Sequence, residues 1–131
     1  MSDASSPLLT SQFRSAMQFS LELHAYQLRK GTQTPYIAHL LAVTALVLED
    51  GGDEDQAIAA LLHDAVEDQG GMRTLEEIRR RYGDQVAAIV AACTDAYEDP
   101  KPPWRGRKEA YLQHLAGESQ AALRVSMADK V

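Results

Sequence analysis

Cysteine is nearly absent from this sequence, since Cys93 is the single one among 131 residues. One cysteine can form neither an internal disulfide nor a thiolate cage around a metal ion. Cys93 also lies in the apolar run VAAIVAAC, which favours a small core side chain over a nucleophile. A disulfide-stapled fold is therefore excluded.

Long apolar runs are absent too. No stretch reaches the roughly 18 apolar residues that a membrane-spanning helix needs, and the N-terminus lacks the basic-then-apolar pattern of a signal peptide. We therefore expect a cytoplasmic protein with no membrane partner.

Positive charge is scarce: 13 Lys and Arg face 19 Asp and Glu, a formal net charge of −6. Proteins that bind nucleic acids generally carry a basic surface, so we expect no nucleic-acid partner. An anionic small substrate stays possible, because a metal ion and a few basic side chains can dominate a cleft. The sequence does not indicate an oligomeric state.

The apolar residues recur at helical spacing, and no segment alternates with a period of two. The sequence predicts an all-α fold, a single helical bundle of about six to seven helices in one domain, 1–131, with an N-terminal tail at 1–8. Asp53 and Thr74 are the expected N-caps of two helices. The expected helices are 9–29, 36–50, 54 to 66 or 67, 75–82, 84–93, 105–116, and 119 or 120 to 131.

The stretch AIAALLHDAVED, residues 57–68, is the most informative in the chain. Six apolar residues lead directly into His63-Asp64, and a second acidic pair, Glu67-Asp68, follows one helical turn later. Polar groups at the end of a buried helix are costly unless something pairs them, and a bound cation would do so. The alternative is a solvated acidic helix end with a core histidine.

One helix cannot supply all the ligands of a metal ion, and His39 and Asp129 are the candidates for the others. A histidine among apolar residues is more often a satisfied core group, and an aspartate before a lysine is more often a surface pair. Imidazole nitrogen together with carboxylate oxygen suits Mn, Fe, Zn or Co better than Ca.

Six segments together resemble the HD superfamily of metal-dependent phosphohydrolases. More narrowly, they are similar to the hydrolase domain of the RelA/SpoT alarmone enzymes and their small stand-alone relatives. The segments occur in family order, and the resemblance extends over nearly the whole chain beyond Gln12. They are RKGTQTPYIAHL (29–40), AALLHDAVED (59–68), TLEEIRRRYGDQVAAIV (74–90), CTDA (93–96), RKEAYLQHL (107–115) and VSMADK (125–130).

The resemblance implies an HD-domain helical bundle whose metal ion, typically Mn²⁺, is held by four side chains. Those four are His39, His63, Asp64 and Asp129. A set of this kind leaves coordination positions open for water and substrate.

The resemblance also implies that Glu67 and Asp68 position or deprotonate the attacking water. Arg29 and Lys30 match a basic pair beside the nucleotide; the alternative for them is compensation of a helix dipole at its C-terminus. Asp95 follows a buried helix and is a further candidate for contact with the substrate, or else a polar residue at a helix end.

The implied activity is hydrolysis of guanosine-3′,5′-bis(diphosphate) at its 3′-pyrophosphate, with release of pyrophosphate. Two alternatives stay open: an HD phosphohydrolase acting on another nucleotide or dinucleotide, and a metal-stabilised regulatory domain that binds a nucleotide without turnover.

Three departures from the family pattern concern the substrate. Leu40 stands where proline is usual, and Ala96-Tyr97 replaces an acidic-basic continuation. The sequence stops at Val131, before an asparagine that contacts substrate in the family. We therefore expect the domain to be incomplete at the C-terminus.

Overall fold

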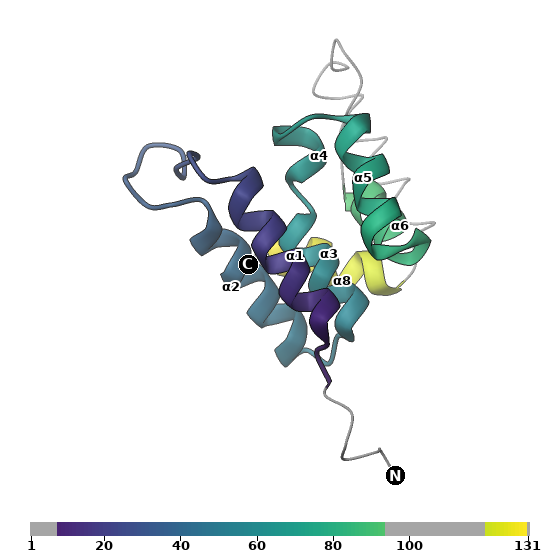
Figure 1. Ribbon diagram of the computed structural model, residues 1–131. Helices are drawn as coiled ribbons and strands as arrows, with labels where there is room; N and C mark the ends of the chain where they lie inside the picture. The colour runs from purple at the N-terminus through teal and green to yellow at the C-terminus, as the bar shows by residue number, and fades with distance from the viewer. Residues whose placement is uncertain (1–7, 94–119, 131) are drawn as a thin grey trace, which may run out of the picture.

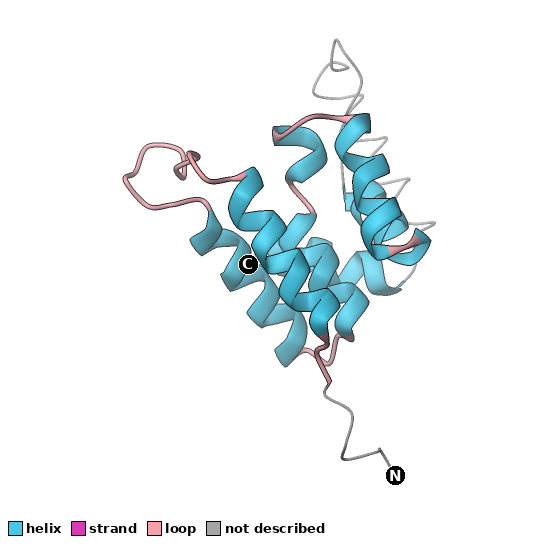
Figure 2. Ribbon diagram, viewed as in Figure 1, coloured by secondary structure: helices cyan, strands magenta, loops and turns pink. Residues whose placement is uncertain are grey.

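The computed structural model describes residues 8–93 and 120–130, and these form an all-α bundle (Figures 1 and 2). Within these ranges there is no strand, and one isolated antiparallel bridge joins Leu28 and Pro35. None of the described helices is long and apolar enough to cross a membrane. The helices are α1 (Ser11–Leu23), α2 (Ile37–Glu49), α3 (Glu54–Leu62), α4 (Ala65–Asp68), α5 (Met72–Tyr82), α6 (Asp84–Cys93) and α8 (Gln120–Lys130).

Helix α3 is the centre of the bundle and contacts α1, α2, α6 and α8 (Figure 1). Its residues 57–62 are all buried. A helix that is apolar on every side needs neighbours on every side, and the run of apolar residues before His63 meets that condition. The start of α3 is fixed by Asp53, whose carboxylate accepts from the N–H of Gln56 at 2.9 Å.

A tight turn joins α2 to α3. Gly52 lies in it, and a Cβ atom at this position would come within 2.6 Å of Val47 Cγ1 and 2.9 Å of Val47 O. Only glycine lets the turn fold back this closely onto the end of α2, and α3 then packs against α2.

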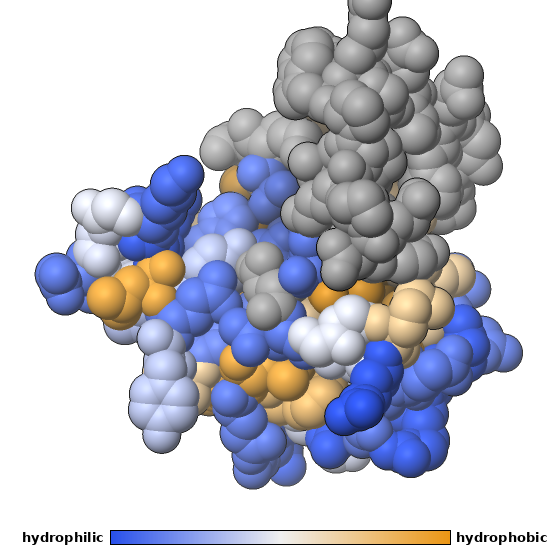
Figure 3. Space-filling model, turned by 90° about the horizontal axis from the view of Figure 1, so that it is seen from above, coloured by the Kyte–Doolittle hydropathy of each residue, from blue (hydrophilic) through white to orange (hydrophobic). Residues whose placement is uncertain are grey.

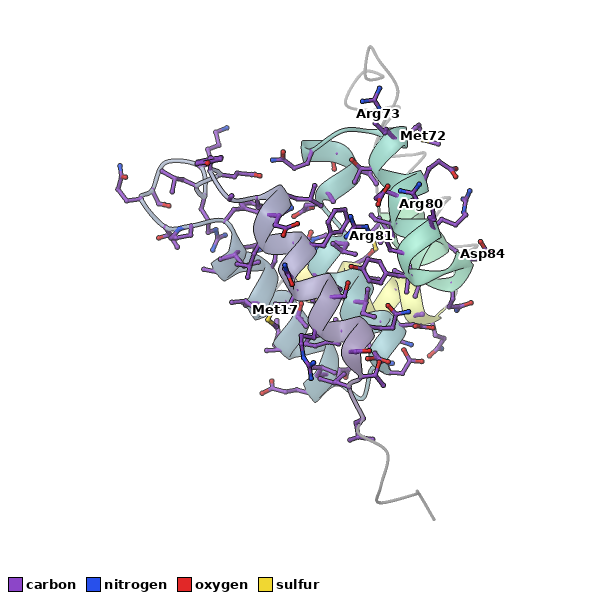
Figure 4. All side chains as sticks on the ribbon, in the orientation of Figure 1. Met17, Met72, Arg73, Arg80, Arg81 and Asp84 are labelled. Carbon is purple, nitrogen blue, oxygen red and sulfur yellow. The ribbon has the colours of Figure 1, made fainter. Side chains whose placement is uncertain are left out.

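Helices α5 and α6 pack against each other, α6 contacts α3, and Tyr82 of α5 contacts Phe19 of α1. Leu75, Ile78 and Tyr82 form the buried side of α5. The guanidinium of Arg81 lies over the ring of Phe19, with Cζ 4.1 Å from the ring centroid (Figure 4). This cation–π contact ties α5 to α1 while leaving the charge near solvent.

Helix α8 carries small residues on its buried side and packs against α2, α3 and α6. Ala122 and Val125 are almost fully buried, and Arg124 donates to Asp50 at 2.9 Å and to Gln56 at 2.7 Å. These contacts hold the first half of α8 in place, and the same helix carries Asp129 in its last turn.

Helices α2, α6 and α8 begin and end within one residue of the predicted positions. The prediction for α1 is wrong at its C-terminus: the helix ends at Leu23 instead of Arg29. Residues 24–36 form a loop closed by hydrogen bonds from Arg29 N to Thr34 O (2.9 Å) and from Tyr36 N to Gln27 O (2.8 Å). Arg29 and Lys30 therefore lie in a loop, which makes the helix-dipole interpretation of this pair wrong.

The predicted helix over 54 to 66 or 67 is also wrong in one respect, because it breaks at His63-Asp64 into α3 and α4. In a continuous helix the carbonyls of Ala60 and Leu61 would accept from Asp64 and Ala65. They accept instead from His63 Nδ1 at 2.7 Å and from Ser20 Oγ at 3.0 Å.

The N-cap predicted at Thr74 is wrong as well. Helix α5 begins at Met72 after Gly71, whose φ is +62°, and the Thr74 hydroxyl donates to the carbonyl of Gln69. The expected helix over 105–116 lies outside the described residues.

Candidate metal centre

Four side chains from three parts of the chain converge at one end of α3. His39 comes from the first turn of α2, His63 and Asp64 from the break between α3 and α4, and Asp129 from the last turn of α8. One donor atom of each lies within 4.8 Å of those of the other three. The helix packing thus brings together all four residues that the resemblance implied.

The distances within this group are short. Oδ1 of Asp129 lies 2.9 Å from Nε2 of His39 and 3.1 Å from Nε2 of His63. Oδ2 of Asp64 lies 3.3 Å from Nε2 of His63 and 4.0 Å from Nε2 of His39. Two imidazole nitrogens and two carboxylate oxygens therefore face a common point.

The ring of His63 has a fixed orientation. Its side chain is only 3% exposed, and Nδ1 donates to the carbonyl of Ala60. Because that carbonyl can only accept, Nδ1 carries a hydrogen and Nε2 is the atom available to the centre. A metal-binding histidine is typically oriented by this kind of second hydrogen bond.

The electrostatics of the centre favour positive charge on His63. Burial by itself lowers the pKa of His63, but the hydrogen bond to Asp129, the charge of Asp64, the Ala60 carbonyl and the charge of Asp129 together outweigh burial. The net result is a raised pKa. A cation bound at this point would offset the same two carboxylates.

The donor set fits a divalent metal ion. Ligand atoms about 2.0–2.2 Å from a common ion lie about 3 Å apart at neighbouring positions and about 4 Å apart at opposite ones. The distances above span this range. Two carboxylates also balance the double positive charge, and mixed nitrogen and oxygen ligands match borderline transition metals.

The other predicted site residues do not belong to this group of four side chains. Glu67 is exposed on α4, and Arg29 and Lys30 are exposed in the loop between α1 and α2. The side chain of Asp68, and Asp95 as a whole, lie outside the described residues. On the face seen from above, the coloured residues are mostly hydrophilic, and apolar side chains form separate patches (Figure 3).

Sequence reasoning missed two residues that support the centre. Tyr36 donates its hydroxyl hydrogen to Oδ2 of Asp64, and Ser20 donates to the carbonyl of Leu61 at the end of α3. For Tyr36 a signal was available, because it precedes His39 by three residues and so lies on the same side of the first turn of α2. Ser20 had no signal, because its partner is 41 residues away.

The fold and this centre define an HD-domain protein, and comparison with known families agrees. The HD domain family matches residues 16–126, so the chain belongs to that family. Since HD-domain hydrolases use a divalent metal, the four converging side chains are a candidate site for one.

Among individual relatives, the chain is 41% identical over 119 residues to the guanosine-3′,5′-bis(diphosphate) 3′-pyrophosphohydrolase MESH1 of Xenopus tropicalis, covering 88% of this chain and 64% of that protein. It is 35% identical over 123 residues to the human protein of the same name, covering 92% and 66%. The chain therefore spans slightly less than two-thirds of these curated relatives.

A solved structure has the same fold. It belongs to a metazoan ortholog of SpoT that hydrolyses ppGpp, and it superposes with a TM-score of 0.82 at 28% sequence identity. The match covers 95% of this chain and 69% of that one. The all-α HD-domain architecture predicted from the sequence is thereby confirmed.

Proposed function

We propose that this chain is a divalent-metal-dependent hydrolase that cleaves the 3′-pyrophosphate from guanosine-3′,5′-bis(diphosphate). The observation that carries the proposal is the convergence of His39, His63, Asp64 and Asp129 within 4.8 Å. It occurs in an HD-domain chain whose relatives are named for this reaction. The products are pyrophosphate and the nucleoside 5′-diphosphate.

We propose Mn²⁺ as the ion, with His39, His63, Asp64 and Asp129 as its ligands. The equal number of nitrogen and oxygen donors supports a borderline transition metal over Ca²⁺ or Mg²⁺. When bound, such an ion makes water acidic enough to act as a nucleophile near neutral pH and polarises a phosphoryl oxygen.

Glu67 and Asp68 are assigned to the attacking water. They lie on α4, which begins directly after Asp64, and Glu67 follows His63 by four residues. A carboxylate at this place can accept a hydrogen bond from water, orient its lone pair toward phosphorus and take up its proton. Neither residue is needed as a ligand, because the four-residue set is complete without them.

Arg29 and Lys30 are assigned to the phosphate groups of the substrate. Both are exposed in the loop between α1 and α2. Gln27 of this loop accepts at Oε1 a hydrogen bond of 2.8 Å from Nε2 of Gln69, the residue that follows α4. The guanidinium of Arg29 can form bidentate hydrogen bonds to phosphate oxygens, and the ammonium group of Lys30 adds a compact positive charge.

Three further assignments belong to this proposal. Asp95 is a third candidate for contact with the substrate. Residues 1–131 form one HD-type domain with a tail at 1–8. The protein acts in the cytoplasm, where its nucleotide substrate would be found.

The substrate is tested by incubating the whole chain with Mn²⁺ and a panel of guanosine and adenosine nucleotides. Release of pyrophosphate from guanosine-3′,5′-bis(diphosphate), without turnover of ordinary mono-, di- and triphosphates, is the expected result. Turnover of another nucleotide alone would overturn the substrate. Tight nucleotide binding with no turnover at all would indicate a regulatory domain.

The water-activating role is tested with Glu67→Gln. Since general acid–base catalysis contributes about 10²- to 10⁴-fold, we expect kcat to fall by this order while Mn²⁺ affinity stays unchanged. Glu49→Gln, an exposed glutamate at the end of α2, is the matched control. An unchanged kcat in Glu67→Gln would remove Glu67 from the mechanism.

A further inference from the structure

Tyr36 joins the loop between α1 and α2 to the candidate metal centre. Its hydroxyl donates to Oδ2 of Asp64, the same oxygen that lies 3.3 Å from Nε2 of His63. We propose that Tyr36 is a positioning residue, whose hydroxyl group orients the Asp64 carboxylate for metal coordination. The inference rests on the metal centre of the proposed function, and assigns a role to a residue that the function leaves unused.

The chemistry of a carboxylate explains why such a donor is useful. Each carboxylate oxygen has two lone-pair directions, so one can accept from Tyr36 while the other is directed at the ion. Asp64 is partly exposed, and its terminal torsion is intrinsically broad. A hydrogen bond to the ligating oxygen restricts that rotation before the ion arrives.

A phenol also suits the charge balance of the centre. Two carboxylates and two neutral imidazoles already neutralise a divalent ion. A lysine or arginine at this position would add positive charge next to the cation, whereas the hydroxyl of Tyr36 orients Asp64 without changing the net charge. This is the usual function of neutral donors behind the ligands of a metal site.

Tyr36 is itself held in place from several directions. Its ring packs between His24 and His39, with centroid separations of 5.2 and 5.5 Å. Its backbone N–H donates to the carbonyl of Gln27 at 2.8 Å. The side chain of Gln27 in turn accepts from Nδ1 of buried His24 at 2.7 Å. The position of the hydroxyl group is therefore fixed by packing, which a positioning role requires.

The place of Tyr36 in the chain strengthens the argument. It immediately precedes α2, three residues before His39. The start of α2 therefore carries one ligand, His39, and the hydroxyl of Tyr36 there orients a second ligand, Asp64, which lies in the break after α3. The placement of His39 relative to Asp64 thus depends on the first turn of α2.

The experiment compares Tyr36→Phe with the parent chain by Mn²⁺ titration, following the EPR signal of the free aqueous ion. The variant keeps the ring and loses the hydroxyl. Loss of an outer hydrogen-bond partner typically weakens metal binding 10- to 100-fold, and this is the expected change. The thermal midpoint without metal should stay the same, and the visible spectrum of bound Co²⁺ should shift. Tyr26→Phe, at a fully exposed tyrosine of the same loop, is the control.

The outcomes distinguish the hydroxyl group of Tyr36 from its ring. Parent-like Mn²⁺ affinity in Tyr36→Phe would overturn the positioning role. So would a loss of affinity confined to Tyr36→Leu, because the ring packing and not the hydroxyl would then be responsible. If the parent chain itself fails to bind Mn²⁺, the metal centre is wrong and the inference fails with it. Parent binding without hydrolysis would overturn only the activity.

Discussion

Nε2 of His39 lies 2.9 Å from Oδ1 of Asp129, although 90 residues separate the two along the chain. Nε2 of His63 lies 3.1 Å from the same oxygen. A single carboxylate oxygen thus joins the first turn of α2, the end of α3 and the last turn of α8. Any ion bound at this point links three helices that pack around one core.

Binding of a metal ion should therefore stabilise the fold, and Asp129→Asn should abolish the effect. For a ligand that binds only the folded state, a hundredfold excess over its dissociation constant contributes about 2.7 kcal/mol. We expect Mn²⁺ to raise the thermal midpoint of the parent chain but not of Asp129→Asn, as measured by circular dichroism. Asp84→Asn, which removes an exposed carboxylate on α6 (Figure 4), should behave like the parent. An undiminished Mn²⁺ shift in Asp129→Asn would contradict the ligand assignment.

Metal affinity should depend on pH through His63. Its pKa is raised above the usual 6.5, and coordination requires the proton on Nε2 to leave. Mn²⁺ affinity should therefore rise with pH until the folded-state pKa of His63 is passed, and weaken by up to about tenfold per pH unit below it. Calorimetric titrations with Mn²⁺ at a series of pH values measure this dependence. A Mn²⁺ affinity that does not change with pH would show that His63 is not a ligand.

The unliganded protein should show the opposite trend in stability. Because the pKa of His63 is raised on folding, the folded state holds the proton more tightly than the unfolded chain does. This contribution is fully present below the unfolded-state pKa and is lost as pH rises through the folded-state pKa. Urea unfolding of metal-free protein should show that loss, and His63→Asn should lack it.

Ser20→Ala should destabilise the end of α3. Ser20 is fully buried, and its hydroxyl donates to the carbonyl of Leu61 at 3.0 Å. Leaving a buried carbonyl without its donor costs about 1–3 kcal/mol, which urea unfolding would detect. Ser11→Ala, at an exposed serine of the same helix, should change the free energy of unfolding far less, and equal effects would argue against this role.

Leu61→Ala should test the central position of α3. Leu61 has no exposed surface, and truncating a buried leucine to alanine costs about 2–5 kcal/mol. Leu21→Ala removes the same atoms from a side chain that is 48% exposed on α1. A large loss at Leu61 and a small one at Leu21 are expected in chemical unfolding. A cost at Leu61 as small as that at Leu21 would mean that α3 is not the core.

The helices that the sequence predicts well have strong local end signals. Pro35 and Gly51-Gly52 bracket α2, and its observed ends differ from the prediction by one residue each. The predicted C-terminus of α1 lies six residues too late. The apolar spacing up to Leu28 favours a longer helix, but the backbone of Gln27 and Arg29 bonds to residues 34–36 instead. These backbone hydrogen bonds within the loop produce no regular spacing of apolar residues, so a sequence pattern does not predict them.

The break at His63-Asp64 shows the same limit. Locally, the apolar run and the acidic residues after it read as one helix. The donors that end α3 are the side chain of His63 itself and that of Ser20, the latter from a different helix. The break also directs His63 and Asp64 toward one point, which neighbouring residues on an ideal helix, about 100° apart, reach less easily.

The sequence by itself determined the all-α class and the buried character of α3, because composition and periodicity are local properties. The set of four converging side chains was implied by the resemblance to the HD family, since residue type alone left His39 and Asp129 as open candidates. Only the tertiary structure decided that His39 and Asp129 meet on one side of α3, that Arg29 and Lys30 lie in a loop, and that Tyr36 bonds to Asp64. The physical reason is that each of these relationships depends on how helices far apart in the chain pack against α3. Packing of that kind is set by the shape and volume of many buried side chains together, and no short stretch of sequence contains it.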